Sequence, residues 1–190
     1  TLARVESAGG TAHYYVADVA APSALSSVLT QVRSQLGSIT GLIHGAGVLS
    51  DKRLREKTSE QVHTVFAPKI VGLQAILAQL ELSALKSITL FSSVAARYGN
   101  AGQADYAMAN EILNRLARSL KARLPHAGVC SLNWGPWDGG MVDASLRRKF
   151  EALGIQLIGK QEGAQLFPNA VLSGPDCQVE LIIGAELPHG

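Results

Sequence analysis

Residues 87–124 read SITLFSSVAARYGNAGQADYAMANEILNRLARSLKARL, a short β-rich run, a glycine-containing loop and a long amphipathic stretch. The run Ser87–Ser92 is typical of a buried strand. From about Gln103 to Leu124 apolar residues recur every three or four positions, which predicts a helix. A strand followed in this way by a helix is the repeating unit of α/β folds.

The rest of the chain alternates in the same way, which predicts an α/β fold with a doubly wound, Rossmann-like parallel sheet. The other expected strands are Ala12–Ala17, Ile39–His44, Val129–Asn133 and Val179–Ile183. The other expected helices are Thr1–Ala8, Pro22–Leu36, Thr58–Leu82, Ala144–Leu153 and Glu162–Leu172. Thr58 and Gln61 predict a capping box, and Pro68 is expected to kink the long helix that they open.

Composition limits the classes of protein to which the chain can belong. Its 190 residues suit one domain, and 47% hydrophobic with 17% charged residues indicates a globular core. A net charge of +2 favours neither nucleic acid nor an anionic membrane as a partner. No apolar run reaches the roughly 18 residues of a membrane span, and the two cysteines, Cys130 and Cys177, are expected to be buried free thiols. We therefore expect a cytoplasmic protein without a metal site.

Two helices carry polar residues within their apolar stripes. Lys69 replaces an apolar residue between Phe66 and Leu73, so it either extends its ammonium to water or meets a partner inside the protein. Tyr106 and Asn110 are four residues apart and share one helix face. A tyrosine with a pKa of about 10 can act as a proton donor if a nearby lysine stabilises the phenolate. An ordinary core tyrosine is the alternative.

These residues together resemble a known family. Ser92-Ser93 at a strand end, followed by Gly102-Gln103-x-x-Tyr106-x-x-x-Asn110, is similar to the ketoreductase domains of polyketide and polyunsaturated-fatty-acid synthases, a branch of the short-chain dehydrogenase/reductase superfamily. Ordinary superfamily members carry Tyr-x-x-x-Lys, whereas in this branch the lysine comes from the preceding long helix, where Lys69 lies. Further matching segments are Asp18-Val19, His44-Gly45-Ala46-Gly47 and Asn133-Trp134-Gly135-Pro136-Trp137.

The resemblance implies a reductase that converts a 3-oxoacyl group, held as a thioester on an acyl carrier protein, to a 3-hydroxyacyl group with NADPH. Tyr106 would give a proton to the carbonyl oxygen, and Ser93, rather than Ser92, would hydrogen-bond that oxygen. Lys69 would lower the pKa of Tyr106 and reach the nicotinamide ribose. Asn110 would hold a water or a backbone group in the proton relay.

The resemblance also implies how the cofactor would be held. Asp18 and Val19 would flank the adenine. The segment His44-Gly45-Ala46-Gly47 would let the backbone approach the cofactor, and Gly135-Pro136 would close beside the nicotinamide. The preference for NADPH over NADH comes from the resemblance alone.

A stereochemical expectation follows from the same comparison. In this family a Leu-Asp-Asp motif marks domains that form the 3R alcohol, and Leu49 and Asp51 match it, whereas Ser50 does not. The opposite class carries a tryptophan eight residues before the tyrosine, where this chain has Tyr98. Gln103 is expected, together with Leu49, Asp51 and Tyr98, to face the substrate and influence the stereochemistry. An ordinary loop carboxylate is the alternative reading of Asp51.

One large part of the family's fold has no counterpart in residues 1–190. The first strand, the glycine-rich phosphate loop, the first helix and the second strand are missing, and no G-x-G-x-x-G or close variant occurs.

Three alternative functions remain: a free-standing 3-oxoacyl-carrier-protein reductase, a non-catalytic structural domain, and a dinucleotide-binding module without chemistry. The position of Asn110 argues against the first. The retained Tyr106 and Lys69 argue against the second, and the missing glycine loop against the third.

We predict that residues 1–190 are not a complete enzyme by themselves. In Rossmann sheets the family's third and fourth strands are not neighbours, so Ala12–Ala17 and Ile39–His44 should leave a gap for two strands of another segment or chain. Residues 1–190 expressed alone should not bind NADPH with ordinary affinity and should not unfold cooperatively on heating. A cooperative fold that binds NADPH, with these two segments paired directly, would contradict the prediction.

Overall fold

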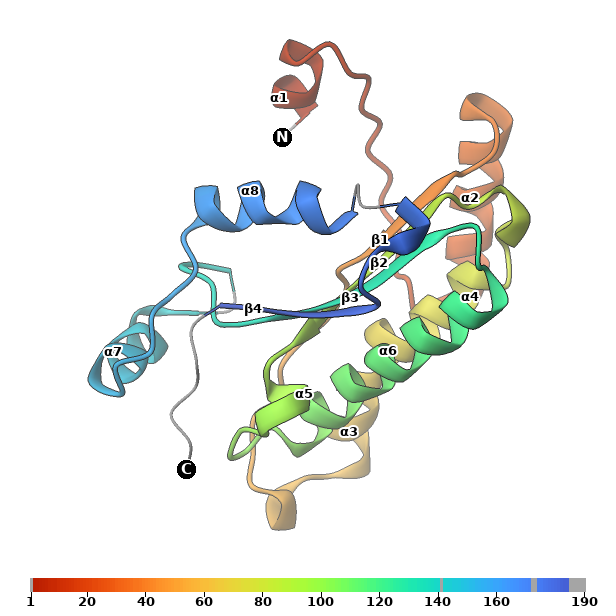
Figure 1. Cartoon of the computed structure of the whole chain (residues 1–190). Helices are drawn as coiled ribbons and strands as arrows, with labels where there is room; N and C mark the ends of the chain where they lie inside the picture. Colours follow the sequence, from red (N-terminus) through yellow and green to blue (C-terminus); the bar gives the residue numbers. More distant parts are fainter. Residues whose placement is uncertain (1, 141, 172–173, 185–190) are drawn as a thin grey trace.

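The computed structural model describes residues 2–140, 142–171 and 174–184, and its centre is a parallel sheet (Figure 1). In these residues the sheet has four strands in the order β1 (Gly41–His44), β2 (Ser87–Ser93), β3 (Gly128–Trp134) and β4 (Glu180–Ile183). Ile88 of β2 is in register with Leu42 on one side and Val129 on the other. The α/β class and the parallel sheet are confirmed.

Helices cover both faces of this sheet, as expected for a doubly wound fold (Figure 1). The helices α3 (Ser59–Phe66), α4 (Gly72–Leu77) and α6 (Ala104–Arg123) lie on one face, and α8 (Lys160–Val171) lies on the other. The larger core, which includes Leu73, Leu113 and Val129, fills the first interface. A smaller cluster around Leu132 and Trp134 fills the second.

The long helix expected over Thr58–Leu82 forms as three pieces. Thr58 caps α3, because its Oγ1 accepts from Gln61 N while Gln61 Oε1 accepts from Thr58 N, so the predicted capping box is present. Pro68 has no N–H for the next helical bond. The chain widens there into a π-helix, Ala67–Val71, before α4 begins. The irregular turn carries Lys69, and π-helical turns are frequent at functional sites.

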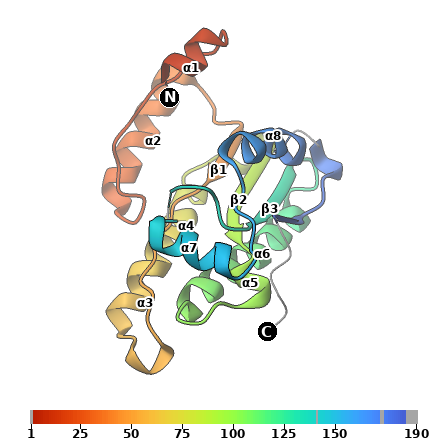
Figure 2. The ribbon, with the colours of Figure 1, turned by 90° about the vertical axis from the view of Figure 1, so that its left-hand side faces the viewer.

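The expected strand Ala12–Ala17 does not form, which is a correction. These residues are extended but pair with no strand in the described part of the chain, and Tyr14 and Val16 are 76% and 80% exposed. They connect α1 (Leu2–Ser7) to α2 (Pro22–Leu36), away from the sheet (Figure 2). A strand needs a partner for its N–H and C=O groups, and β1 pairs only with β2 among the described residues.

The remaining elements are short, and only α7 among them was expected from the sequence. They are η1 (Leu54–Glu56), η3 (Leu82–Ala84), α5 (Ala95–Tyr98), α7 (Ala144–Ala152) and η4 (Gly174–Asp176). Both cysteines are free thiols, Cys130 buried and Cys177 partly exposed. Leu172, the expected end of the helix from Glu162, lies outside the described residues. Within the described ranges, no helix combines the length and the apolarity that a membrane crossing requires.

Candidate active site

A pocket of about 380 Å³ opens at the carboxyl edge of the sheet, where ligands bind in folds of this kind. Three strands contribute to it through the residues at or after their carboxyl ends. These residues are Gly45 and Gly47 after β1, Ser92 and Ser93 in β2, and Gly135 and Pro136 after β3. Tyr106 and Lys69 also line the pocket. The sheet therefore brings together residues that are widely separated along the chain.

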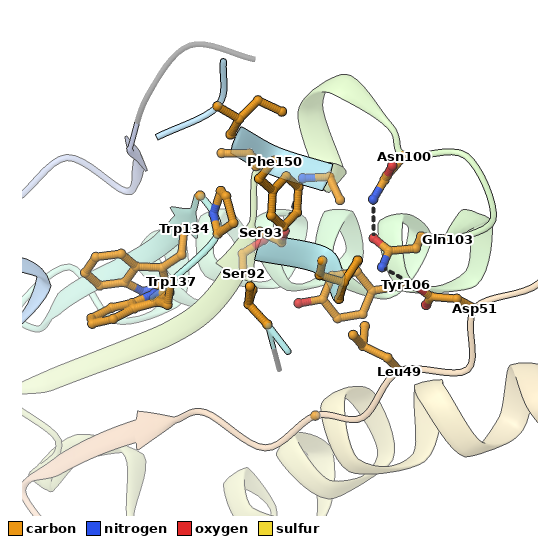
Figure 3. A pocket seen from close by; sticks show the side chains of 18 of the residues that line it. Leu49, Asp51, Ser92, Ser93, Asn100, Gln103, Tyr106, Trp134, Trp137 and Phe150 are labelled. Atoms are coloured by element: carbon orange, nitrogen blue, oxygen red, sulfur yellow. Dashed lines mark hydrogen bonds between the residues drawn. The ribbon is translucent and has the colours of Figure 1, made fainter. Parts of the chain in front are cut away.

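Tyr106 lies in the first turn of α6 and faces the middle of the pocket beside Ser93 (Figure 3). Burial raises the pKa of the Tyr106 hydroxyl above its ordinary value of 10.0. The Asn110 and Ser93 side chains oppose this by lowering the pKa, and the nearby Asp51 carboxylate raises it. The hydroxyl is thus protonated at neutral pH and is available as a proton donor.

Lys69 is buried rather than extended into water. The residue is 4% exposed, and its Nζ donates to the carbonyl oxygen of Phe91 at 3.1 Å. The ammonium also lies over the ring of Tyr106, 5.4 Å from the centroid, in cation–π geometry. Burial lowers the pKa of Lys69 from 10.5 to about 8. A protonated Lys69 at neutral pH places a positive charge beside the tyrosine.

The pKa of Tyr106 is raised overall despite this nearby charge. Lys69 was expected to lower the pKa of Tyr106, but the pKa of Tyr106 is raised, with burial as its largest cause. The ammonium lies over the ring face, and burial removes water that would stabilise the phenolate. Burial thus sets the net direction of the pKa, and a lowering contribution from Lys69 stays a prediction, as does its catalytic role.

Gly47 explains how the β1 turn accommodates the buried lysine. A Cβ atom on Gly47 would lie 2.9 Å from Lys69 Cε and 3.3 Å from its Nζ, closer than a side chain can approach without displacement. A larger residue at position 47 would therefore require the end of the Lys69 side chain to shift. His44, the last residue of β1, is buried, and its Nε2 lies 3.0 Å from the carbonyl oxygen of Lys69. Burial lowers the pKa of His44, which keeps the ring neutral.

The two serines of β2 have different surroundings. Ser92 is buried, and its Oγ lies 3.1 Å from Asn110 O and 3.0 Å from Asn133 Oδ1. Ser93 is partly exposed to the pocket, and its Oγ accepts from Ala95 N at 3.2 Å. Ser93 is therefore the more accessible of the two serines and lies next to Tyr106, and the choice of Ser93 over Ser92 stays a prediction.

Asn110 lies one turn beyond Tyr106 and is completely buried. Its Nδ2 donates to the backbone oxygen of Tyr106 at 2.8 Å. Its Oδ1 has no hydrogen-bond partner among the described residues. A buried acceptor without a partner is costly, so this atom points to a water or a ligand group at the place where a proton relay was expected.

The far side of the pocket is formed by the loop after β1. Leu49 and Asp51 line it, and Gln103 donates from Nε2 to Asp51 Oδ2 at 2.8 Å. Asn100 in turn donates to Gln103 Oε1 at 2.9 Å (Figure 3). Tyr98, the fourth expected substrate-side residue, is 51% exposed and does not line the pocket, which is a correction. It ends α5, beyond the pocket rim.

Several expected cofactor residues lie elsewhere. Asp18 caps its own turn by accepting from Ala20 N at 2.8 Å, and Val19 packs against Gly72 of α4. His44 and Ala46 do not line the pocket either. The structure thus brings together only part of the expected cofactor set in this pocket: Gly45, Gly47, Lys69, Tyr106, Gly135 and Pro136.

The apolar part of the pocket was not anticipated from the sequence. Trp134 packs on Trp137 with ring centroids 4.7 Å apart and on Phe91 at 5.7 Å. The remaining apolar lining comes from residues in and around α7, namely Val142, Leu146, Phe150, Leu153 and Ile155. The first four are spaced by three or four residues, a pattern that predicts a helix but does not say which ligand that helix faces.

A Rossmann-like sheet with tyrosine, serine and buried lysine around one pocket defines a protein of the short-chain dehydrogenase/reductase type. The chain belongs to the KR domain family, whose model matches residues 1–139. It is 35% identical over 182 residues to a polyunsaturated fatty acid synthase subunit of Thraustochytrium sp. (strain ATCC 26185 / S-3), covering 94% of this chain and 6% of that protein. It is 37% identical over 145 residues to polyketide synthase PksN of Bacillus subtilis (strain 168), covering 74% of this chain and 3% of that protein.

Solved structures agree with the sequence relatives. A ketoreductase domain from the bacillaene assembly line is 30% identical with a TM-score of 0.82, covering 96% of this chain and 45% of that one. The first-module ketoreductase of phoslactomycin biosynthesis in Streptomyces sp. HK803 is 28% identical with a TM-score of 0.84, covering 94% of this chain and 40% of that one. The chain therefore spans less than half of each of these structures and a few per cent of the synthases.

We predict that Lys69→Met does not lower the thermal stability of the complete domain at pH 7. The same substitution should remove most of the reductase activity. The folded-state pKa of about 8 is below the ordinary 10.5, so the unfolded chain binds more protons between these values. Wild-type stability should therefore rise from pH 8 to 10.5, and any stability advantage of the variant should shrink over that window.

The measurement is thermal unfolding from pH 7 to 10.5, together with the pH profile of turnover. Turnover should fall as pH rises through about 8, since Lys69 loses its charge while Tyr106 stays protonated. Lys86→Met, at an exposed lysine before β2, is the control and should match the wild type in both. A turnover that is flat from pH 7 to 9.5 would contradict the prediction.

Proposed function

We propose that the chain is the catalytic part of an NADPH-dependent ketoreductase domain that reduces a 3-oxoacyl thioester on an acyl carrier protein to the 3-hydroxyacyl product. The main support for this proposal is that Tyr106, Ser93 and the buried Lys69 line one pocket at the carboxyl edge of the sheet. Each of the three residues supplies a separate requirement of ketone reduction.

The residues around the pocket fit a bound nicotinamide. Gly45, Gly47 and Gly135 put bare backbone at the pocket wall, and the Asn110 Oδ1 without a partner among the described residues lies behind Tyr106. Lys69 and Tyr106, with these glycines and Pro136, would hold the nicotinamide end. When bound, the reduced cofactor supplies a hydride to the carbonyl carbon. NADPH rather than NADH is part of the proposal, as is the placement of the adenine near Asp18 and Val19.

The chain's own residues would manage the carbonyl oxygen. The Ser93 hydroxyl donates a hydrogen bond to that oxygen, which stabilises the negative charge that develops there. Tyr106 transfers its hydroxyl proton to the same oxygen, so that the C=O double bond becomes C–OH. The Lys69 ammonium favours the resulting phenolate electrostatically, and Asn110 positions the group that returns a proton to Tyr106.

The lining of the pocket supports an acyl substrate. Trp134, Trp137 and the residues of α7 form an apolar wall on one side of Tyr106, whereas Asp51 and Gln103 form a polar rim on the other (Figure 3). An apolar wall suits a hydrocarbon chain, and a few polar groups fix its orientation. The acyl carrier protein and neighbouring synthase domains are the proposed partners, in keeping with the multienzyme relatives.

We also propose that another segment or chain completes the sheet. The outer edge of β1 is unpaired in the described residues, and Ile43 on it is 57% exposed. The extended residues 12–17, with Tyr14 and Val16 exposed, lack a partner strand in the described ranges as well. Added strands would satisfy both sets of backbone groups.

One assay separates this function from the alternatives. NADPH oxidation by the complete domain with a 3-oxoacyl thioester, or with a bicyclic decalone as a surrogate ketone, supports a ketoreductase. Cofactor binding without oxidation would indicate a dinucleotide-binding module. Neither binding nor oxidation would indicate a structural domain. Comparable turnover of a carrier-free and a carrier-bound thioester by the isolated domain would favour a free-standing reductase.

We predict that Tyr106→Phe lowers turnover of the complete domain by about 10²–10⁴-fold, because only the proton-donating hydroxyl is removed. The pocket and the packing of α6 should persist, so the unfolding temperature should change little. Tyr98→Phe, at an exposed tyrosine outside the pocket, is the matched control and should keep wild-type turnover. Near-normal turnover of Tyr106→Phe would show that another group donates the proton.

We predict that the product is the 3R alcohol. Leu49 and Asp51, which match the motif of the 3R class, line the pocket, and Gln103 donates a hydrogen bond to the Asp51 carboxylate. Chiral chromatography of the hydroxyacyl product, released from the thioester, measures the outcome directly. A product that is mainly 3S would overturn the assignment, whatever the rate.

A further inference from the structure

A buried ion pair lies behind the polar rim of the pocket and has no part in the chemistry proposed above. Lys57 Nζ is 2.7 Å from Asp105 Oδ2, and each side chain is only 2% exposed. In every other ion pair of the described residues, at least one side chain is 27% exposed or more. Removing two charges from water is costly, so a buried pair is a poor way to gain stability alone.

The two residues come from elements that meet at the pocket. Lys57 ends the loop that follows β1, which carries Leu49 and Asp51, and directly precedes the cap of α3. Asp105 is the second residue of α6, next to Tyr106. The pair therefore joins the loop that forms one wall of the pocket to the helix that carries the proposed proton donor.

Both side chains make second contacts that extend this connection. Lys57 Nζ also donates to the carbonyl oxygen of Ser50, between the wall residues Leu49 and Asp51. Asp105 uses its other oxygen, Oδ1, to accept from the backbone N–H of Tyr106 at 2.9 Å. A continuous path of polar contacts thus runs from the backbone of the wall to the backbone of Tyr106.

Weaker bonds accompany the pair on the solvent side. Lys52 N donates to Gly102 O at 3.0 Å, and Gln103 Nε2 donates to the exposed Asp51 carboxylate at 2.8 Å. Hydrogen bonds open to water have water as a competitor, whereas charge-assisted bonds away from water are stronger and fix geometry. The buried pair is thus the firmest of the connections between the loop and α6.

We propose that Lys57 and Asp105 are positioning residues that hold the Leu49–Asp51 wall at a fixed place relative to Tyr106, and so decide which face of the ketone is presented for reduction. They act through Leu49 and Asp51 and touch no substrate atom. The inference rests on the proposed ketoreductase function, which it deepens by naming what sets the stereochemical outcome.

The test compares four variants of the complete natural polypeptide. Lys57→Met and Asp105→Asn each leave one buried charge without its partner, and both should lose thermal stability. The double variant K57M/D105N removes both charges and keeps an oxygen for the Tyr106 N–H, so it should remain folded. Arg55→Met removes a neighbouring ion pair of the same loop, with Glu56, that is 73% and 52% exposed, and is the matched control.

Three readouts separate positioning from mere stability. In K57M/D105N the minor alcohol should increase at least about tenfold as a share of product, the size of discrimination that pocket contacts can supply. KM for the acyl thioester should rise more than kcat falls, since Tyr106, Ser93 and Lys69 are untouched. The Lys52 amide should exchange its hydrogen faster. Arg55→Met should leave all three unchanged.

Each result decides the proposal. An unchanged alcohol ratio and KM in a folded double variant would overturn it, and so would a double variant that does not fold, because the pair would then serve stability alone. A wild-type polypeptide that does not reduce a 3-oxoacyl thioester would instead refute the proposed function. In that case, hydrogen exchange of the Lys52 amide in K57M/D105N would still show whether the ion pair holds the loop. An exchange rate equal to that of the wild type would then overturn the inference as well.

Discussion

The buried ammonium of Lys69 is the constraint on which the site depends. An ammonium removed from water needs polar partners, and here they are the Phe91 carbonyl of β2 and the Tyr106 ring of α6, while Gly47 after β1 leaves room for the side chain. The irregular π-turn at Pro68 places Lys69 there, and His44 contacts the carbonyl of the same turn. Burial of this charge costs stability and lowers the pKa of the lysine to about 8, and such perturbed charges cluster at functional sites.

A second buried polar group sets the position of α6 on the sheet. Asn114 Nδ2 donates to Asn133 Oδ1 at 3.0 Å, and Ser131 Oγ donates to Asn114 Oδ1 at 2.7 Å. Ser92 joins the same oxygen of Asn133. Hydrogen-bonded groups in a dry core accept little displacement, so these bonds fix the helix that carries Tyr106 against the strand that carries Ser93. The Lys57–Asp105 pair adds a third connection, between this helix and the loop after β1.

The pocket has an apolar side and a polar side, which can contact different parts of a ligand. Trp134, Trp137 and Phe150 form one wall, and Asp51 with Gln103 forms the opposite rim (Figure 3). Tyr106 and Ser93 lie between them, so a ligand that fills both halves places a polar group at the centre. Shape and polarity together therefore orient a ligand before any chemistry occurs.

Local sequence determined most of the elements and the central site residues. Periodicity and capping predicted the helix Pro22–Leu36, the helix from about Gln103 to Leu124 that forms as α6, and the four strands that form, because these signals lie within a few residues of one another. Spacing and resemblance also singled out Tyr106, Ser93, Lys69 and Asn110. The tertiary structure alone decided the rest. Residues 12–17 have strand-like sequence but no described strand beside them, the burial of Lys69 depends on Gly47 and Phe91, and Lys57 meets Asp105 from 48 residues away. Such outcomes depend on partners distant in sequence, which no local pattern encodes.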